Sequence, residues 1–182
     1  MNAQSFWFQP QHPAARLGLK GADAARLLQQ AGIDVPGVAN AITHPRGDAG
    51  TRCLRLGNTE FLLEQDAGSE TIERVRTLAA TGDFRAWPVL RADHCLLLGG
   101  PALFERLSHV ASFDFETLAG SPDRVVMTLA AEISVTLALD GGDPTHPQLR
   151  LWADASFGTY LEQTLRTLSQ DYSTASRHGD PA

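Results

Sequence analysis

Residues 52–64 carry the strongest local fold signal in this sequence of 182 residues. Two short apolar runs, residues 53–56 and 61–63, are separated by Gly57-Asn58-Thr59. Glycine and asparagine tolerate positive φ angles, so the pattern predicts a β-hairpin with its turn over these residues. Apolar and polar residues alternate in the first run but not in the second. The second strand is therefore predicted to be buried on both faces.

The composition restricts the kind of partner and the cellular location. A net charge of -6 and a pI near 5.4, with no local basic cluster, argue against nucleic-acid binding, which needs a basic surface for the phosphates. The first residues lack the basic and apolar regions of a signal peptide, and every apolar run is far shorter than the roughly 20 residues that cross a bilayer. Cys53 and Cys95 both lie in apolar runs. This favours two reduced, buried thiols in a cytoplasmic protein, with a disulfide between neighbouring strands as the alternative.

The chain divides into an arm, a compact domain and a tail. Residues 16–168 contain the periodic apolar patterns and are predicted to form one compact domain. The arm, residues 1–15, carries the consecutive aromatic residues Phe6-Trp7-Phe8, which either pack on the domain's own core or dock onto a partner. Residues 169–182 are polar and are predicted to be disordered.

Within the domain, two segments of about residues 16–82 and 88–168 show the same order of predicted elements. Each has a strand ending at glycine, a helix, a loop, a strand pair and a second helix. Residues 60–64 of the first segment correspond to residues 148–152 of the second. One such segment leaves an apolar sheet face uncovered, so each needs the other. The sequence predicts an α+β fold made of two related strand-helix-hairpin-helix halves.

Glycines at two strand-to-helix junctions are the first candidates for a ligand site. Gly18-Leu19-Lys20-Gly21 and Gly99-Gly100 lie where a phosphate can bind free backbone N–H groups. Neither completes a dinucleotide-binding or P-loop motif, and no acidic residue follows at the spacing of a ribose contact. We interpret both as tight turns.

Other candidate chemistry is equally incomplete. His94 and Cys95 are neighbours on a predicted strand, so their side chains point to opposite faces and cannot share one metal ion. Glu60 and Glu64 are too far apart along a strand to share a proton and are interpreted as a solvated rim. No Gly-x-Ser-x-Gly motif marks a nucleophile, and the remaining histidines are scattered, at His12, His44, His109, His146 and His178. The sequence predicts no catalytic, cofactor-binding or metal-binding residue on this chain.

Three motifs in a fixed order resemble a known family. They are Leu-Arg-Leu-Gly-Asn-Thr-Glu-Phe-Leu-Leu-Glu at 54–64, Leu-Leu-Leu-Gly-Gly-Pro-Ala at 96–102, and Ser-Phe-Gly-Thr-Tyr-Leu at 156–161. Together they resemble the γ subunit of heterotetrameric sarcosine oxidase. That family is related in fold to the folate-binding domains of the glycine-cleavage aminomethyltransferase and of iron–sulfur assembly proteins. The Lys-Gly-Cys-Tyr-x-Gly-Gln-Glu signature of the iron–sulfur group is absent here.

The resemblance implies a fold and a role. The fold is two halves with largely antiparallel sheets and packed helices, as in the aminomethyltransferase folate-binding domain. The role is a non-catalytic accessory subunit, with α, β and δ subunits as partners. Those partners hold FAD, FMN, NAD, tetrahydrofolate and zinc. The complex oxidatively demethylates sarcosine to glycine, forms hydrogen peroxide and passes the one-carbon unit to tetrahydrofolate.

Three alternatives stay open on the sequence alone. One is a stand-alone folate-binding or aminomethyltransferase-like protein, with Glu60 or Glu64 near the pterin in a pocket between the halves. Another is the γ subunit of a related secondary-amine dehydrogenase. The third is an unrelated α+β binding module.

Overall fold

A computed structural model describes residues 5–48 and 50–175, with side chains described as far as residue 169. The chain forms two compact units. The N-terminal unit is made of residues 12–92 and 123–126, and the C-terminal unit of residues up to 11, 93–122 and from 127 onward. Each unit contains a five-stranded sheet. The registered strand pairs are all antiparallel.

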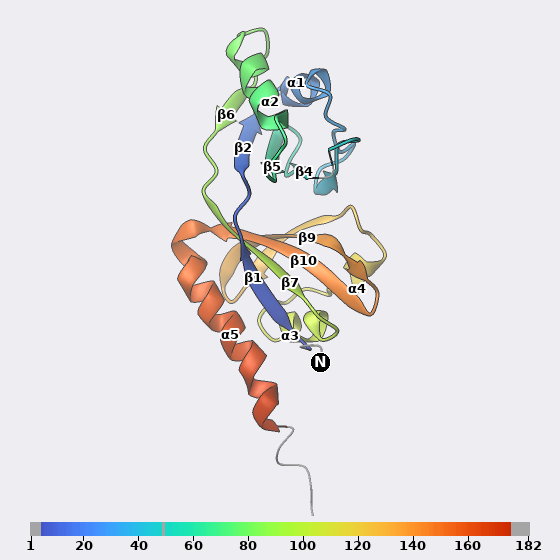
Figure 1. The fold of residues 1–182 in the computed structure, drawn as a ribbon, viewed down its shortest axis with the longest axis vertical. Helices are drawn as coiled ribbons and strands as arrows, with labels where there is room; N and C mark the ends of the chain where they lie inside the picture. The colour runs from blue at the N-terminus through green and yellow to red at the C-terminus, as the bar shows by residue number, and fades with distance from the viewer. Residues whose placement is uncertain (1–4, 49, 176–182) are drawn as a thin grey trace, which may run out of the picture. The chain divides into compact units, whose positions relative to one another are not determined.

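The N-terminal unit packs two helices against one face of its sheet (Figure 1). The strand order is β3-β4-β5-β2-β6. The elements are β2 (Ala15–Lys20), α1 (Ala24–Gln30), β3 (Ala41–Thr43), β4 (Thr51–Arg55), β5 (Glu60–Gln65), α2 (Thr71–Ala80) and β6 (Trp87–Val89). Apolar side chains from the strands and both helices form its core, including Leu19, Leu27, Leu28, Phe61, Leu63, Ile72 and Val75.

The predicted hairpin is formed by β4 and β5, but its turn differs from the expectation. β5 lies between β4 and β2, and all its residues after Glu60 are buried, as predicted. Neither Gly57 nor Asn58 has a positive φ angle, so the reason given for the turn was wrong. The Arg55 guanidinium instead holds the turn, because it donates to the carbonyl oxygens of Gly57 at 3.3 Å and Asn58 at 3.1 Å.

One carboxylate fixes the start of α2. Asp48 Oδ2 accepts hydrogen bonds from the hydroxyls of Thr51 at 2.7 Å, Ser69 at 2.5 Å and Thr71 at 2.7 Å. The Thr71 N–H also donates to Ser69 Oγ at 3.1 Å, so Ser69 satisfies one of the free N–H groups at the start of α2. Asp48 thereby joins the loop before β4 to the first turn of a helix that follows β5.

We expect Asp48→Asn to lower the free energy of unfolding by about 1–3 kcal/mol at neutral pH, because a charged acceptor of three hydroxyls is lost. Burial raises the pKa of the Asp48 carboxyl, but the hydrogen bonds from Ser69, Thr51 and Thr71 outweigh it, so the pKa lies below its ordinary 3.8. A depressed pKa in the folded state gives stability that is present above the unfolded pKa and is lost as the pH falls through the folded pKa.

Urea denaturation over a series of pH values tests this expectation. The difference between wild type and Asp48→Asn should be full at neutral pH and should shrink once the pH falls below about 3.8. Asp83→Asn, at an exposed position, is the control and should change little. A difference that stays constant across the acid range would show that the carboxylate charge is irrelevant.

The C-terminal unit has the sheet order β1-β7-β10-β9-β8. Its strands are β1 (Trp7–Gln11), β7 (Asp93–Gly99), β8 (Val125–Ala130), β9 (Ile133–Asp143) and β10 (His146–Asp154). Its helices are α3 (Leu103–Ser108), α4 (Glu116–Ala119), the 3₁₀ helix η1 (Ala155–Phe157) and α5 (Gly158–Ala175). β8 starts on residues of the N-terminal unit and continues into the C-terminal one. Asp140-Gly141-Gly142-Asp143-Pro144 has the composition of a loop, but β9 continues to Asp143.

The two sheets have the same strand order when corresponding strands are compared. β6, β2, β5, β4 and β3 of one correspond to β1, β7, β10, β9 and β8 of the other. The registers agree as well, since Lys20 pairs with Glu60 where Gly99 pairs with Gln148. The predicted fold class, α+β with two related halves and largely antiparallel sheets, is confirmed.

The two edge strands that precede each half are exchanged. β1 comes immediately before β2 in sequence but pairs with β7, whereas β6 comes immediately before β7 and pairs with β2. The predicted arm therefore contains a strand of the C-terminal unit, and Phe6 is only 4% exposed. At the other end, α5 continues to Ala175, past the predicted end at residue 168, and the rest of the predicted tail lies outside the described residues.

Candidate functional site

The carboxylates considered from the sequence lie in different environments. Glu64 is fully buried and accepts from Arg16 Nη2 at 2.8 Å and Arg16 Nε at 3.1 Å. Glu60 is partly exposed and pairs with Lys20 at 3.1 Å. The expectation of a solvated rim is therefore wrong for Glu64, because Arg16 lies directly opposite it on the neighbouring strand. Arginine does not give up its proton in proteins, so the buried pair is structural.

The C-terminal unit also buries an arginine–carboxylate pair. Arg150 Nη2 on β10 lies 2.7 Å from Asp140 Oδ2 on β9, and both side chains are less than one tenth exposed. Arg150 Nη1 also contacts Cys95 Sγ at 3.7 Å. Both sheets therefore contain arginine–carboxylate pairs that are largely shielded from water. Each pair joins two neighbouring strands of its sheet.

The side chains of the adjacent residues His94 and Cys95 contact different groups. His94 Nε2 lies 3.1 Å from Glu162 Oε1 on α5, whereas Cys95 contacts Arg150. Cys53 and Cys95 are both free and buried, and burial raises the pKa of the Cys53 thiol to about 12. Such a thiol is protonated at neutral pH and is a poor nucleophile. Within the described residues, no group of three or more His, Cys, Asp or Glu side chains is placed to hold a metal ion.

The glycine junctions are tight turns. Gly21 and Gly100 have φ angles of 144° and 114° and end corresponding strands of the two units. The Gly21 N–H donates to the Thr59 carbonyl at 2.9 Å, so it is not available to a phosphate. The helices that follow, α1 and α3, have only 7 and 6 residues. The geometry agrees with the interpretation as turns.

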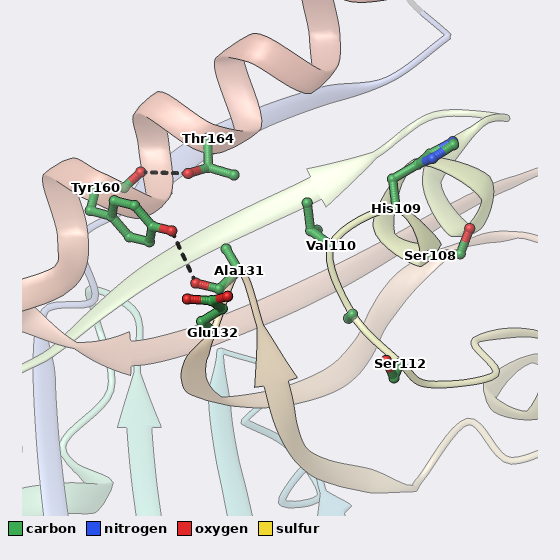
Figure 2. Close-up of a pocket in the computed structure, with 9 residues that line it drawn as sticks. Ser108, His109, Val110, Ser112, Ala131, Glu132, Tyr160 and Thr164 are labelled. Carbon is green, nitrogen blue, oxygen red and sulfur yellow. Dashed lines mark hydrogen bonds between the residues drawn. The ribbon is translucent and has the colours of Figure 1, made fainter.

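The C-terminal unit has an open pocket of about 420 Å³ beside the β8–β9 turn, which we call the turn pocket (Figure 2). Three segments form its walls: the end of α3 with the following loop, the β8–β9 turn, and the first turns of α5. Its lining is mostly polar and consists of Ser108, His109, Val110, Ala111, Ser112, Ala131, Glu132, Tyr160 and Thr164.

Backbone strain is concentrated at the turn that lines this pocket. Ala131 and Glu132 have φ angles of 51° and 66°, in the left-handed region that glycine and asparagine favour. Both backbone groups of Ala131 are held, since its N–H donates to the Val110 carbonyl at 2.7 Å and its carbonyl accepts from the Tyr160 hydroxyl at 3.2 Å. Two-residue hairpin turns of this kind are usually Asn-Gly. Strained residues of this kind cluster at functional sites.

We expect the double substitution Ala131→Asn with Glu132→Gly to raise the free energy of unfolding by about 1–2 kcal/mol, because both residues then adopt their φ angles with little strain. Guanidinium denaturation of the purified chain measures the change. Ala130→Asn with Ile133→Gly, which alters the flanking buried strand residues, is the control and should destabilise the chain. An unchanged or lowered stability for the first variant would mean that the turn carries no releasable strain.

A second hollow lies in the N-terminal unit. It measures about 540 Å³ and lies beside the end of α1 and the outer side of α2. Its lining consists of Gln30, Ala31, Glu70, Glu73, Arg74, Thr77 and Leu78. The backbone of this hollow has ordinary helical geometry, without the strained residues of the turn pocket. The turn pocket is therefore the better candidate for a functional site.

Sequence reasoning did not single out the residues of the turn pocket. The apolar runs at 124–129 and 132–139 have the pattern of two strands and leave a very short connection that lacks glycine, asparagine and aspartate. The absence of these residues from such a short connection was the one signal in the sequence that pointed to backbone strain. Tyr160 appeared in the sequence only as part of the motif at 156–161 and was assigned no contact, yet it is 47% exposed and its hydroxyl contacts the turn.

Comparison with known proteins shows what the fold is similar to. No family model and no curated protein matches the sequence. Among solved structures, a chain of heterotetrameric sarcosine oxidase from Corynebacterium sp. U-96, in complex with pyrrole 2-carboxylate, matches with a TM-score of 0.77 at 21% identity. The match covers 99% of this chain and 90% of that one.

Glycine cleavage system aminomethyltransferase T from Bartonella henselae is also similar, with a TM-score of 0.54 at 14% identity. That match covers 82% of this chain but only 42% of the aminomethyltransferase, so the chain spans less than half of its length. The fold is thus of the type found in sarcosine oxidase and aminomethyltransferase. The resemblance stated from the sequence motifs is confirmed at the level of fold.

Proposed function

We propose that this chain is a non-catalytic accessory subunit, γ-like, of a cytoplasmic heterotetrameric sarcosine oxidase. The observation that carries the proposal is the fold match to a sarcosine oxidase chain over nearly the full length of both chains. The match to the aminomethyltransferase, by contrast, leaves more than half of that protein uncovered. A chain of this size therefore resembles one whole component of the oxidase and only a portion of the transferase.

In the proposed assembly, the α, β and δ subunits are the partners of this chain. They hold the FAD, FMN, NAD, tetrahydrofolate and zinc of the complex, which demethylates sarcosine to glycine and transfers the one-carbon unit to tetrahydrofolate. The sequence motifs at 54–64, 96–102 and 156–161 support this role through the family they resemble. Among the described residues, no helix combines the length and apolar character needed to cross a membrane.

Co-purification tests the proposal. The tagged chain, co-expressed with candidate α, β and δ subunits, is purified by the tag and passed over a size-exclusion column. We expect the visible absorbance of bound flavin to elute together with the chain. An untagged chain gives the control for non-specific recovery of flavoprotein. Repeated elution of the chain alone, with the partner subunits present and folded, would overturn the proposal.

The aminomethyltransferase match favours a second candidate, a protein that binds folate by itself. Titration calorimetry of the isolated chain with tetrahydrofolate distinguishes the two. Heat of binding without any partner would support the stand-alone folate-binding protein. If a complex is recovered, its activity on sarcosine compared with other secondary amines separates an oxidase of sarcosine from a related secondary-amine dehydrogenase.

A further inference from the structure

We propose that the turn pocket receives an arginine side chain of the flavin-containing partner subunit, with the Glu132 carboxylate as its counter-ion. The inference rests on the proposed function for the identity of the partner. It rests on the pocket itself for the chemistry of the group that binds.

The turn pocket contains a carboxylate, that of Glu132, without an ion-pair partner among the described residues. Glu132 is exposed, and in the described part of the chain its carboxylate makes no hydrogen bond or ion pair. Its backbone φ of 66° would be easier for glycine, yet the position holds a long acidic side chain. The two hydrogen bonds of Ala131 to Val110 and Tyr160 prevent the turn from relaxing. The backbone that carries Glu132 is therefore held in place at the mouth of the pocket.

Three hydroxyl groups of the pocket are oriented as acceptors. Ser108 donates its hydrogen to the Glu105 carbonyl at 2.6 Å, Thr164 donates to the Tyr160 carbonyl at 3.0 Å, and Tyr160 donates to the Ala131 carbonyl. A hydroxyl has a single hydrogen, so each of these oxygens keeps only lone pairs for a ligand. Figure 2 shows the Tyr160 and Thr164 hydrogen bonds on the wall formed by α5. These three acceptor oxygens and the Glu132 carboxylate favour a cationic ligand with several N–H donors, although His109 in the same lining can also donate.

An aromatic surface adjoins the carboxylate. The ring is that of Tyr160, which is 47% exposed and lies beside Ala131 and Glu132. A planar guanidinium stacks on aromatic rings and donates to a carboxylate at the same time, which a lysine ammonium does less well. Arginine and aromatic residues also dominate the energetics of protein interfaces. Charge and shape therefore both favour arginine.

The source of the arginine follows from the openness of the site and the proposed assembly. The pocket is open to solvent, so a side chain that projects from another protein surface can enter it. The chain carries a net charge of -6, which favours docking of a partner surface that presents basic groups. The flavin-containing subunit is the partner whose docking the proposed function requires.

Reconstitution measures the contribution of Glu132. The purified chain is titrated into the complex of the other subunits, and the dissociation constant is measured at several salt concentrations. We expect Glu132→Gln to weaken assembly about tenfold, the equivalent of one charge-assisted contact, and to reduce the salt dependence. Glu116→Gln, at an exposed acidic position of the same unit, is the matched control and should change affinity less than about twofold. Thermal unfolding of both variants should match wild type.

The outcomes separate the two proposals. If wild type does not assemble with the flavin-containing subunit, the proposed function fails and this inference fails with it. If wild type assembles and the two variants bind equally well, only the arginine site is overturned.

A photo-cross-linker in place of Ser112 identifies the occupant. Its capture of a partner peptide with an arginine, whose replacement by methionine costs nothing further in the Glu132→Gln background, would support the pairing. Fully additive losses, or capture of a second copy of this chain, would overturn it.

Discussion

Glu64→Gln is expected to lower the free energy of unfolding by about 3–5 kcal/mol, because it leaves the Arg16 guanidinium buried without its counter-ion. The Glu64 side chain is fully buried and that of Arg16 is 11% exposed, so water cannot replace the lost carboxylate charge. Urea denaturation of the purified chain measures the loss. The value should greatly exceed that of any exposed ion pair on the same sheet.

Two further variants make this expectation specific. Lys20→Met removes the exposed partner of Glu60, with 53% of the lysine side chain in solvent, and should cost less than about 1 kcal/mol. Arg16→Met combined with Glu64→Leu removes both charges and should restore much of the stability, since burying a charge pair costs desolvation. If the double variant is as unstable as Glu64→Gln, packing rather than charge explains the loss.

Gly21→Ala is expected to cost about 2–4 kcal/mol, because the added methyl group overlaps the backbone of the segment before β6. An alanine Cβ at this position would lie 2.1 Å from the Arg85 carbonyl oxygen and 2.7 Å from the Ala86 Cα. The φ angle of 144° adds strain for any residue with a side chain. Relief would require the Gly21 turn to move away from Arg85, which would break the hydrogen bond from Gly21 to Thr59.

Gly57→Ala is the matched control for this substitution. Gly57 lies in the β4–β5 turn with an ordinary φ angle, and the nearest atom to an added Cβ is Glu60 Cβ at 3.8 Å. Its stability should change by less than about 0.5 kcal/mol. Comparable losses for the two glycines would contradict the steric explanation and would favour a general need for glycine flexibility.

The sequence was sufficient to predict the repeated plan of the fold, because that plan depends on local patterns. The unbroken apolar run at 61–63 predicted a strand buried on both faces, and β5 is such a strand. Corresponding apolar runs predicted that residues 60–64 and 148–152 are equivalent, and their registers agree. Patterns of this kind record which face of an element is buried, and burial decides the fold.

Features that depend on distant partners were not predictable in the same way. Glu64 looked like a surface residue because its counter-ion, Arg16, lies 48 residues away in sequence. β1 pairs with β7 and β6 pairs with β2, so each strand joins the sheet of the other half. The residues of β1 and β6 contain no local pattern that indicates which sheet edge they pair with. The hairpin turn shows a related effect. The sequence predicted that positive φ angles at glycine and asparagine form the turn, whereas hydrogen bonds from the Arg55 side chain hold it.

The candidate site was missed for a physical reason. Sequence motifs mark catalytic and metal sites because such chemistry needs particular residue types at particular spacings. A pocket for a partner's side chain needs only acceptors and a charge on a fixed backbone, and Ala131-Glu132 has no motif. Three separate segments supply the lining of the turn pocket, from residues 108–112, 131–132 and 160–164.

The exchanged edge strands determine the order in which the protein can be completed on the ribosome. β1 leaves the exit tunnel before β2, but its pairing partner β7, at Asp93–Gly99, is synthesised only after the N-terminal unit's strands β2 to β6. The N-terminal unit can close its sheet once β6 has emerged, apart from the short contribution of residues 123–126. Residues 7–11, which include Trp7 and Phe8, therefore remain without their strand partner until the second half of the chain is synthesised. Nascent chains of this protein expose that segment until β7 has emerged, which makes it a natural contact for chaperones during synthesis.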